Sequence, residues 1–304
     1  MKYTVILPNY NHSEYLKKRI DSILNQSFQD FELIILDDNS LDNSEEIICE
    51  YNNHPKISHI IFNEVNSGSV FMQWKKGLDL AKGEYVWIAE SDDYSEITFL
   101  EEMNDILNLN CEIAFCQSLM FIENEIVYQS KSDLLRKVHL GPDFMRSRMG
   151  YNNSLFNASM VVFKKDLIKN VDFGKLGEYK FCGDWFFWIE LLKKSNIGES
   201  GKCLNYFRKH NSDLSGKSNS NGIMLSEFVE IQLYLTKISI ISKSEYFSNI
   251  LKKFDDVKHS KFNSIENIEI IKINSRTVPK YYRLKFHARK KIRIFLKFIR
   301  CFRS

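Results

Sequence analysis

The chain has 304 residues, of which 44% are hydrophobic and 27% are charged, as is ordinary for a soluble globular protein. These proportions exclude a mainly disordered chain, and no run of about 18 apolar residues predicts a membrane span. Only 4 prolines and 12 glycines, with no evident repeat, favour one large α/β domain with an appendage.

The cysteines and the first residues predict a reduced, cytoplasmic protein. Six cysteines are scattered without a C-x-x-C pair or a Cys/His cluster at zinc spacing. The apolar run Tyr3–Leu7 is too short for the apolar region of a signal peptide.

The net charge of +3 conceals an asymmetry. Ten Lys and Arg residues and no acid lie in residues 280–304, so residues 1–279 carry +3 less 10, or −7. A mildly acidic body therefore precedes a strongly basic, aromatic-rich tail.

Short apolar runs alternate with amphipathic segments in the first half, which predicts βα units around a mostly parallel sheet. The expected strands are Tyr3–Leu7, Phe31–Leu36, Ile57–Phe62 and Tyr85–Ala89. Helical spacing predicts helices over residues 15–24, 42–52 and 70–81.

Polar clusters follow three of these strands, at Pro8–Asn11, Asp37–Ser40 and Ser91–Asp93. Ligands bind beyond the carboxyl ends of strands in open parallel sheets, although Asn, Asp and Ser also simply form turns. Asp92 and Asp93 directly follow a buried strand, where adjacent carboxylates suit a divalent metal ion and a diphosphate. The alternative is that Asp92 caps the helix expected from Thr98.

After Asp93 the pattern predicts a mixed sheet, with strands that need not follow the parallel order. The expected strands are Ile113–Phe121, Glu125–Gln129, Ala158–Phe163 and Gly201–Arg208. A helix is expected over Gly183–Leu192 with Asp184 at or near its N-cap, and residues 222–275 are helical in tendency.

Seven short motifs occur together in one order and at one spacing. Through them the chain resembles the family-2 glycosyltransferases, which have the GT-A fold, from Tyr3 to about Ser215. The motifs are Val5–Asn11, Ile35–Asp42, Asn66–Gly68, Ala81–Tyr85, Glu90–Asp93, Gly183–Trp185 and Tyr206–His210.

The resemblance implies an α/β, Rossmann-like nucleotide-sugar-binding domain with a mixed, mainly parallel central sheet. We expect this domain over residues 1–215, a helical extension over 216–279 and a basic amphipathic tail over 280–304.

For the nucleotide, the resemblance implies that Tyr10 stacks on the base and that Asp38 accepts a hydrogen bond from a uracil imide. Pro8 and Asn11 belong to the loop that shapes this pocket. The implied donor is therefore a nucleotide-sugar, with UDP as its nucleotide.

For the phosphates, the resemblance implies that Asp93 holds Mg²⁺ or Mn²⁺ and that Asp92 lies near the ribose and the metal. His210 would be a third metal ligand, or a surface histidine. Arg208 and Lys75 would contact the nucleotide-sugar. The alternative for Arg208 is a solvated surface charge.

Asp184 matches the position of the family's catalytic base. It would deprotonate the acceptor hydroxyl as that oxygen attacks the anomeric carbon, which gives inversion in one step. The alternative is a plain helix cap.

The chain departs from the common family pattern at several positions. Glu90 stands where an Asp is usual, and the pair Trp74–Lys75 stands where Arg-Asn is usual. Asn39 replaces a Gly, which is tolerated because Asn adopts the left-handed backbone. The Gln-x-x-Arg-Trp signature of processive synthases is absent, so we expect a single addition per encounter.

Residues 280–304 interleave aromatic and aliphatic side chains with the ten cations. Such a segment is typical of a cationic helix on an anionic leaflet, and it predicts a peripheral protein on the inner face of the cell membrane. The alternatives are a terminal helix packed on the domain, or nucleic-acid binding, which no recognised fold accompanies.

Together these features predict an inverting, metal-dependent glycosyltransferase that adds one hexosyl or N-acetylhexosaminyl unit to a glycan or glycolipid acceptor. One alternative is a nucleotidyltransferase, but residues 8–12 supply no Gly-rich basic phosphate loop. The other is a non-catalytic nucleotide-sugar-binding scaffold at a membrane.

Overall fold

The computed structural model describes residues 1–122, 125–209, 222–260 and 264–288. Contacts divide the chain into two compact units. The first comprises residues 1–147 and 153–211, and the second comprises residues 148–152 and 212–304.

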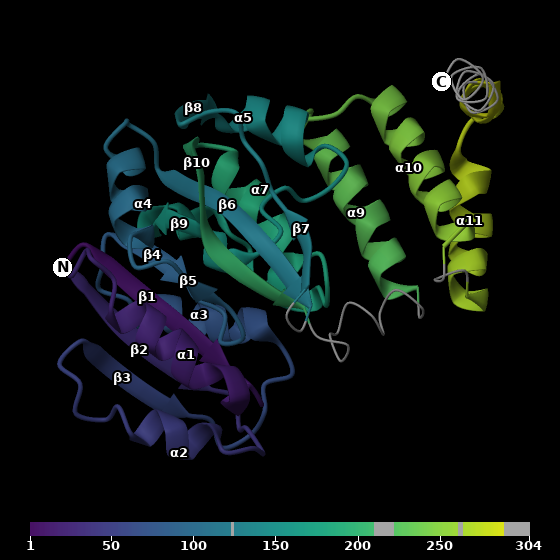
Figure 1. The fold of residues 1–304 in the computed structure, drawn as a ribbon. Helices are drawn as coiled ribbons and strands as arrows, with labels where there is room; N and C mark the ends of the chain where they lie inside the picture. Colours follow the sequence, from purple (N-terminus) through teal and green to yellow (C-terminus); the bar gives the residue numbers. More distant parts are fainter. Residues whose placement is uncertain (123–124, 210–221, 261–263, 289–304) are drawn as a thin grey trace. The chain divides into compact units, whose positions relative to one another are not determined.

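The first unit is built from strands and helices in alternation, as Figure 1 shows. Its strands are β1 (Tyr3–Asn9), β2 (Phe31–Asp37), β3 (Ile57–Phe62), β4 (Tyr85–Ile88), β5 (Tyr94–Ser95), β6 (Ile113–Ile122), β7 (Glu125–Gln129), β8 (Arg136–Leu140), β9 (Val161–Lys164) and β10 (Asn196–Lys209). Its helices are α1 (Ser13–Leu24), α2 (Ser44–Cys49), α3 (Val70–Leu80), α4 (Phe99–Leu107), α5 (Gly141–Phe144), α6 (Phe173–Glu178) and α7 (Gly183–Leu192).

The strands form one sheet in the order β3-β2-β1-β4-β9-β6-β10-β5, with β7 beside β6 and β8 beside β10. The first four strands in this order are parallel, whereas β9 is antiparallel to both β4 and β6. The predictions of a parallel first half and a mixed second half are therefore confirmed. The parallel strands are buried along almost their whole length, which explains their continuous apolar runs.

Helices cover both faces of the sheet. Trp87 of β4 stacks on Phe99 of α4, with ring centroids 4.4 Å apart, and the Arg19 guanidinium of α1 lies 4.9 Å over the Trp87 ring. Phe163 of β9 is paired with the neighbouring Val86 and therefore points to the opposite face, where it packs against Phe187 of α7. This layering places the loops that follow β1, β2 and β4 outside the packed core.

Most expected elements are present, with shifted ends. The predicted strand Ala158–Phe163 is partly wrong, because Ala158–Met160 is a 3₁₀ turn and the strand spans Val161–Lys164. Thr98, not Asp92, occupies the N-cap position of α4, and Cys182, not Asp184, occupies that of α7.

Other elements were not anticipated. They are β5, β8, α5, α6, a π-helical turn at Met145–Met149 and a 3₁₀ helix at Lys165–Asn170. These elements are short or strongly charged, so their sequences lack an extended periodic spacing of apolar residues.

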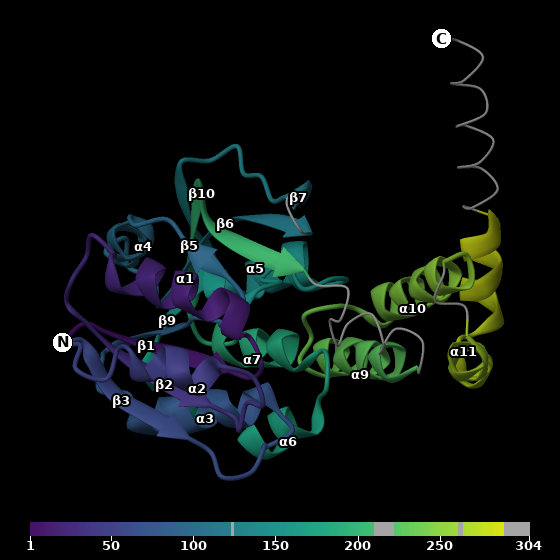
Figure 2. The same ribbon diagram turned by 60° about the horizontal axis from the view of Figure 1, so that its bottom comes forward.

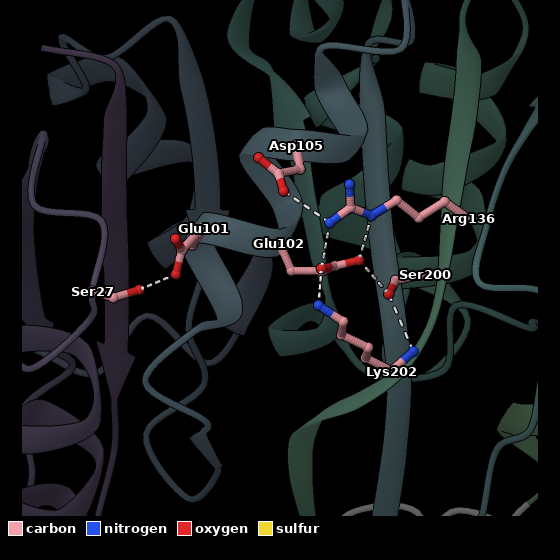
Figure 3. A network of polar contacts seen from close by, with 7 residues as sticks. All are labelled: Ser27, Glu101, Glu102, Asp105, Arg136, Ser200 and Lys202. Carbon is pink, nitrogen blue, oxygen red and sulfur yellow. Dashed lines mark hydrogen bonds and ion pairs between the residues drawn. The ribbon is translucent and has the colours of Figure 1, made fainter.

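A buried carboxylate ties the antiparallel part of the sheet together (Figure 3). Glu102 of α4 is 2% exposed and accepts two hydrogen bonds from Arg136 of β8, at 2.9 and 2.8 Å. Lys202 and Ser200 of β10 also donate to it. This network joins one helix to two strands that are distant in sequence.

The second unit contains three long helices, drawn in light green to yellow in Figure 2: α9 (Ile223–Lys237), α10 (Lys243–Lys258) and α11 (Ile265–Thr277). Ser242 and Glu245 form a reciprocal capping box at the start of α10. Residues 280–288 are helical, and the rest of the predicted basic tail lies outside the described residues. Within the described ranges, no helix is both long and apolar enough to cross a bilayer.

Candidate active site

The carboxyl ends of β1, β2 and β4 meet at one edge of the sheet. Asn9 is paired with Asp37 across β1 and β2, and Ile6 is paired with Ile88 across β1 and β4. The strand register therefore brings the three predicted polar clusters to the same edge of the sheet. They are Pro8–Asn11, Asp37–Ser40 and Ser91–Asp93.

Hydrogen bonds fix the loop after β1 to the loop after β2. Asn9 Nδ2 donates to Asp37 Oδ2 at 2.8 Å, and the backbone N–H of Asn11 donates to Ser40 Oγ at 2.9 Å. Ser40 Oγ donates in turn to Asp37 Oδ2 at 2.6 Å. The two loops therefore form one bonded framework at the sheet edge.

Asparagine serves the tight turns in this framework. Asn11 has φ +56° and Asn39 has φ +62°, in the left-handed region that Asn tolerates better than most residues. Pro8 is buried within β1, whereas the side chain of Tyr10 is 44% exposed. The Tyr10 ring is thus accessible at the predicted nucleotide-binding edge.

Asp38 is almost fully buried and accepts several hydrogen bonds. Its Oδ1 accepts from Asn63 Nδ2 at 2.6 Å, from the backbone N–H of Ser67 at 2.9 Å and from Gln73 Nε2 at 2.7 Å. Its Oδ2 accepts from Ser67 Oγ at 2.8 Å. Residues from the loop that follows β3 and from α3 therefore hold this carboxylate in one orientation.

Asp93 is 1% exposed and is held by two donors from the antiparallel part of the sheet. Asn157 Nδ2 donates to Oδ2 at 2.8 Å, and the backbone N–H of Arg208 donates to Oδ1 at 3.1 Å. Burial and then the charge of Asp92 raise the pKa of Asp93 to about 7, although the charge of Arg19 and the hydrogen bonds from Ser159 and Asn157 oppose the shift.

Glu90 lies beside the two aspartates and accepts the indole N–H of Trp74 at 3.0 Å. Burial, followed by the charges of Asp92 and Asp93, raises the pKa of Glu90 to about 8. Three carboxyl groups thus crowd one edge of the sheet, and this crowding favours a bound cation.

The carboxylate donors suit a hard divalent ion. Mg²⁺ is commonly held by one or two carboxylates together with substrate phosphates, so Asp92 and Asp93 fit this arrangement. Among the described residues, no group of three or more His, Cys, Asp and Glu side chains forms a complete metal-binding set. The remaining ligands would therefore have to come from elsewhere, such as a bound diphosphate.

Arg19 supplies a positive charge beneath this edge. Its side chain is completely buried, and none of its three guanidinium nitrogens has a hydrogen-bond partner. Burial lowers the pKa of Arg19 to about 10, while Asp93 and Glu90 act in the opposite direction, so the group is a cation at neutral pH. Its charge partly compensates the three acids.

Arg208 borders the same cluster, at the end of β10. Its Nε donates to the backbone oxygen of Asp92 at 3.1 Å, and its guanidinium lies 4.3 Å over the Tyr15 ring and 4.6 Å over the Phe121 ring. These contacts place Arg208 next to Asp92.

Asp184 is the second residue of α7. Its Oδ2 accepts from Asn153 Nδ2 at 2.9 Å, and its side chain is partly exposed. The adjacent Gly183 is required by close packing, because an added Cβ would lie 2.3 Å from the Phe71 ring of α3. This contact sets the position of α7 and so of Asp184.

The remaining predicted site residues have other surroundings. Lys75 is paired with Asp79 of the same helix at 2.6 Å, and its Nζ lies 5.9 Å from the Phe173 ring centroid. Neither contact involves the three-acid cluster of Glu90, Asp92 and Asp93. His210 lies outside the described residues.

Four residues at the site had no predicted role: Asn157, Ser67, Gln73 and Arg19. Of these, Arg19 had a usable signal, since it lies three residues after Leu16 on the apolar stripe of α1. A charged residue on a buried stripe indicates a buried partner. The other three contact acids that are distant in sequence. Ser67 lies in the motif Asn66–Gly68, which had no predicted contact, and no local pattern marks Asn157 or Gln73.

The sequence profile of the family described as Glycosyl transferase family 2 matches residues 4–171. Among curated relatives, a GalNAc(5)-diNAcBac-PP-undecaprenol beta-1,3-glucosyltransferase of Campylobacter jejuni is 24% identical over 290 residues. This alignment covers 90% of each chain.

Solved structures share the fold. Staphylococcus aureus TarS 1-349 in complex with UDP-GlcNAc matches with a TM-score of 0.68 and 19% identity, over 86% of this chain and 74% of that one. The mannosyltransferase PcManGT of Pyrobaculum calidifontis, in complex with GDP-Man and Mn²⁺, matches with a TM-score of 0.56 and 13% identity, over 94% and 83%.

The predicted GT-A fold, with its central sheet and flanking helices, is therefore confirmed. Because the family profile spans more than half of the chain, this protein belongs to glycosyl transferase family 2 and is a glycosyltransferase that transfers sugar from a nucleotide-sugar donor.

Proposed function

We propose that the protein is an inverting, metal-dependent enzyme that transfers one sugar from a UDP-sugar to a hydroxyl of a cell-surface glycan or lipid-linked acceptor. The sugar is a hexosyl or N-acetylhexosaminyl unit. The observation that carries the proposal is the buried Asp93, held by Asn157 and Arg208 within a three-acid cluster. Family membership favours sugar transfer over nucleotidyl transfer.

We assign the nucleotide to the sheet edge between Tyr10 and Asp38. The exposed Tyr10 ring supports stacking on a base, and the fixed carboxylate of Asp38 supports recognition of its imide. Pro8 and Asn11 shape the pocket wall through the bonded loops. Arg208 lies beside Asp92, where a cation would stabilise the diphosphate.

We assign Mg²⁺ or Mn²⁺ to Asp93 and Asp92, with His210 as a further candidate ligand. When bound, the ion supplies positive charge that stabilises the nucleoside diphosphate as it leaves. The relative solved with Mn²⁺ gives precedent for a metal in this fold. Lys75 keeps a secondary role in donor binding, after release from Asp79.

We assign the catalytic base to Asp184. Its carboxylate takes the proton of the acceptor hydroxyl, and the hydroxyl oxygen forms a bond to the anomeric carbon as the bond to the diphosphate breaks on the opposite face. Inversion follows from this single displacement. Asn153 would hold the carboxylate in place through the 2.9 Å hydrogen bond.

The nucleotide site is tested by calorimetric titration of the protein with UDP, with and without Mn²⁺. We expect tight binding that needs both the metal and Asp93, and at least a tenfold loss in Asp93→Asn. Asp105→Asn, which changes an exposed carboxylate of α4, is the matched control. Metal-independent binding unaffected by Asp93→Asn would count against the proposal and favour a non-catalytic scaffold.

We further propose that residues 1–215 carry out the transfer, that residues 216–279 form a helical extension, and that residues 280–304 serve attachment at the inner face of the cell membrane. Tyr281 and Leu284 are 64% and 61% exposed between basic residues of the described helical segment 280–288. Deleting residues 280–304 should abolish co-sedimentation with anionic liposomes. Unchanged sedimentation would reject the membrane role.

A further inference from the structure

The carboxylate of Asp38 has almost no capacity left to accept hydrogen bonds. Each of its oxygens offers two lone pairs. Oδ1 already accepts three donors, from Asn63, Ser67 and Gln73, at 2.6 to 2.9 Å. Oδ2 accepts one donor, Ser67 Oγ, at 2.8 Å. A ligand therefore finds one open acceptor position, on Oδ2.

Gln73 controls the direction of the Ser67 hydroxyl. Gln73 Nε2 donates to Ser67 Oγ at 3.1 Å, so one lone pair of the Ser67 hydroxyl oxygen is occupied. The single hydroxyl proton then has two acceptors in reach, Asp38 Oδ2 at 2.8 Å and the Ser69 carbonyl at 3.1 Å. The shorter contact, to a charged acceptor, is the stronger one.

We propose that Ser67, oriented by Gln73, is a specificity-determining residue for the nucleobase of the donor. The Ser67 hydroxyl fills one of the two acceptor positions on Asp38 Oδ2 and leaves one open. One open position suits a base that has one donor on its recognised edge, which is uracil or thymine. The inference rests on the proposed function, in which Asp38 accepts the imide N–H.

The number of open acceptor positions on Asp38 also disfavours guanine. Its Watson–Crick edge presents two adjacent donors, N1–H and N2–H, and would need two open acceptor positions. With one available, the second donor is buried without a partner and meets the donating Ser67 hydroxyl. Cytosine and adenine present a ring acceptor in place of the imide N–H, and this acceptor faces the carboxylate. Uracil and thymine avoid both conflicts.

The test is a competition experiment with UDP, dTDP, GDP, CDP and ADP at one fixed concentration of Mn²⁺. The phosphates and metal are common to all five, so the ratios of Kd report on the base. We expect UDP and dTDP to bind at least about tenfold more tightly than GDP. In Ser67→Ala, Oδ2 gains a second open position, and the preference for UDP over GDP should narrow by about tenfold.

Ser69→Ala is the matched control, because its hydroxyl lies in the same loop and has no hydrogen-bond partner. It should leave the UDP-to-GDP ratio unchanged. Gln73→Met should narrow the ratio in the same direction as Ser67→Ala, and a melting curve will report whether this buried change preserves the fold.

The outcomes separate the two proposals. If the wild type binds UDP but Ser67→Ala keeps the wild-type ratio, or if the wild type prefers GDP, the specificity role is overturned while the transferase assignment stands. If the wild type binds none of the five nucleotides, the proposed function fails and the specificity role fails with it.

Discussion

Trp74 donates its indole N–H to Glu90 Oε1 at 3.0 Å, so two positions at which the chain departs from the common family pattern bond to each other. Glu90 replaces an Asp and Trp74 replaces an Arg in that pattern. An indole carries a donor but no charge. Trp74 therefore gives Glu90 a neutral hydrogen-bond donor, and Arg19 on another helix supplies a positive charge near Glu90.

Glu90 should make stability fall with rising pH in the absence of metal. Its pKa is about 8 in the folded state and about 4.5 in a solvated chain. The folded state therefore holds the extra proton, and this stabilisation is complete below about pH 4.5 and lost as pH rises through about 8. In Glu90→Gln the decline should be shallower, by up to about 1.4 kcal/mol per pH unit.

Urea unfolding between pH 6 and 9, with EDTA present, measures this difference. Asp93 contributes a decline of the same sign because its pKa is also raised, so the variant should retain part of the slope. Parallel stability curves for wild type and Glu90→Gln would show that Glu90 does not titrate as inferred. Adding Mn²⁺ should flatten the wild-type curve.

Arg19 should couple energetically to Glu90. The cation lies near the acids, so Arg19→Met should be more destabilising when Glu90 is ionised than when residue 90 is neutral. At pH 9 we expect a coupling of about 1–2 kcal/mol in a double-mutant cycle with Glu90→Gln, and a smaller coupling at pH 6. If Arg19 only packs on the Trp87 ring, Arg19→Met will cost the same in both backgrounds.

The parallel half of the fold could be predicted because its residues act locally. Val86, Trp87 and Ile88 form a short apolar run whose alternate side chains are buried on the two faces of the sheet, and polar residues follow it. Helix α7 likewise begins and ends where its sequence indicates, at Gly183 and Leu192. The places of Asp38 and Asp93 after the ends of β2 and β4 were therefore predicted from the sequence.

The antiparallel strands and several contacts of the site depend on partners that are far away in sequence. Strand β8 reads as a charged surface segment, yet it pairs with β10, where His139 lies 2.9 Å from the buried Glu199. Asn157 occupies the N-cap position of the 3₁₀ turn Ala158–Met160 and donates to Asp93, 64 residues earlier in the chain. No local period encodes such contacts, because only the folded topology brings the two segments together.

Glu102 should be a principal source of acid sensitivity. Burial alone would raise the pKa of Glu102, but hydrogen bonds from Arg136, Lys202 and Ser200 outweigh it and hold the pKa at about 2. The resulting stabilisation is present above about pH 4.5 and is lost as pH falls towards about 2. Glu102→Gln should cost about 3 kcal/mol at pH 7 and should make the acid limb less steep.

Urea unfolding of Glu102→Gln and Asp105→Asn at pH 7 and pH 3 provides the measurement. Asp105 also contacts Arg136, at 2.8 Å, but is 44% exposed, so its replacement should cost less than about 1 kcal/mol. Equal losses in the two variants would contradict a special role for the buried carboxylate. UDP binding should remain intact in folded Glu102→Gln, because the network in Figure 3 includes none of the residues that we assign to nucleotide binding.

Asp184→Asn should separate chemistry from donor binding. The amide preserves the shape of the side chain and can still meet Asn153, but it cannot take a proton at neutral pH. We expect kcat for sugar transfer to fall by about 10²–10⁴-fold, with UDP affinity within about twofold of wild type. Asn153→Ala should give a smaller loss, because the base remains and only its orientation is loosened.

The pH profile distinguishes a base from a helix-end residue. The pH profile of kcat should change in shape in Asp184→Asn, because only the wild-type carboxylate can take the proton of the acceptor hydroxyl. A structural contribution of Asp184 to α7 would instead lower the melting temperature and leave the shape of the profile unchanged. Retention of the wild-type profile with only a lower melting temperature would therefore remove Asp184 from the chemistry and restrict it to the start of α7.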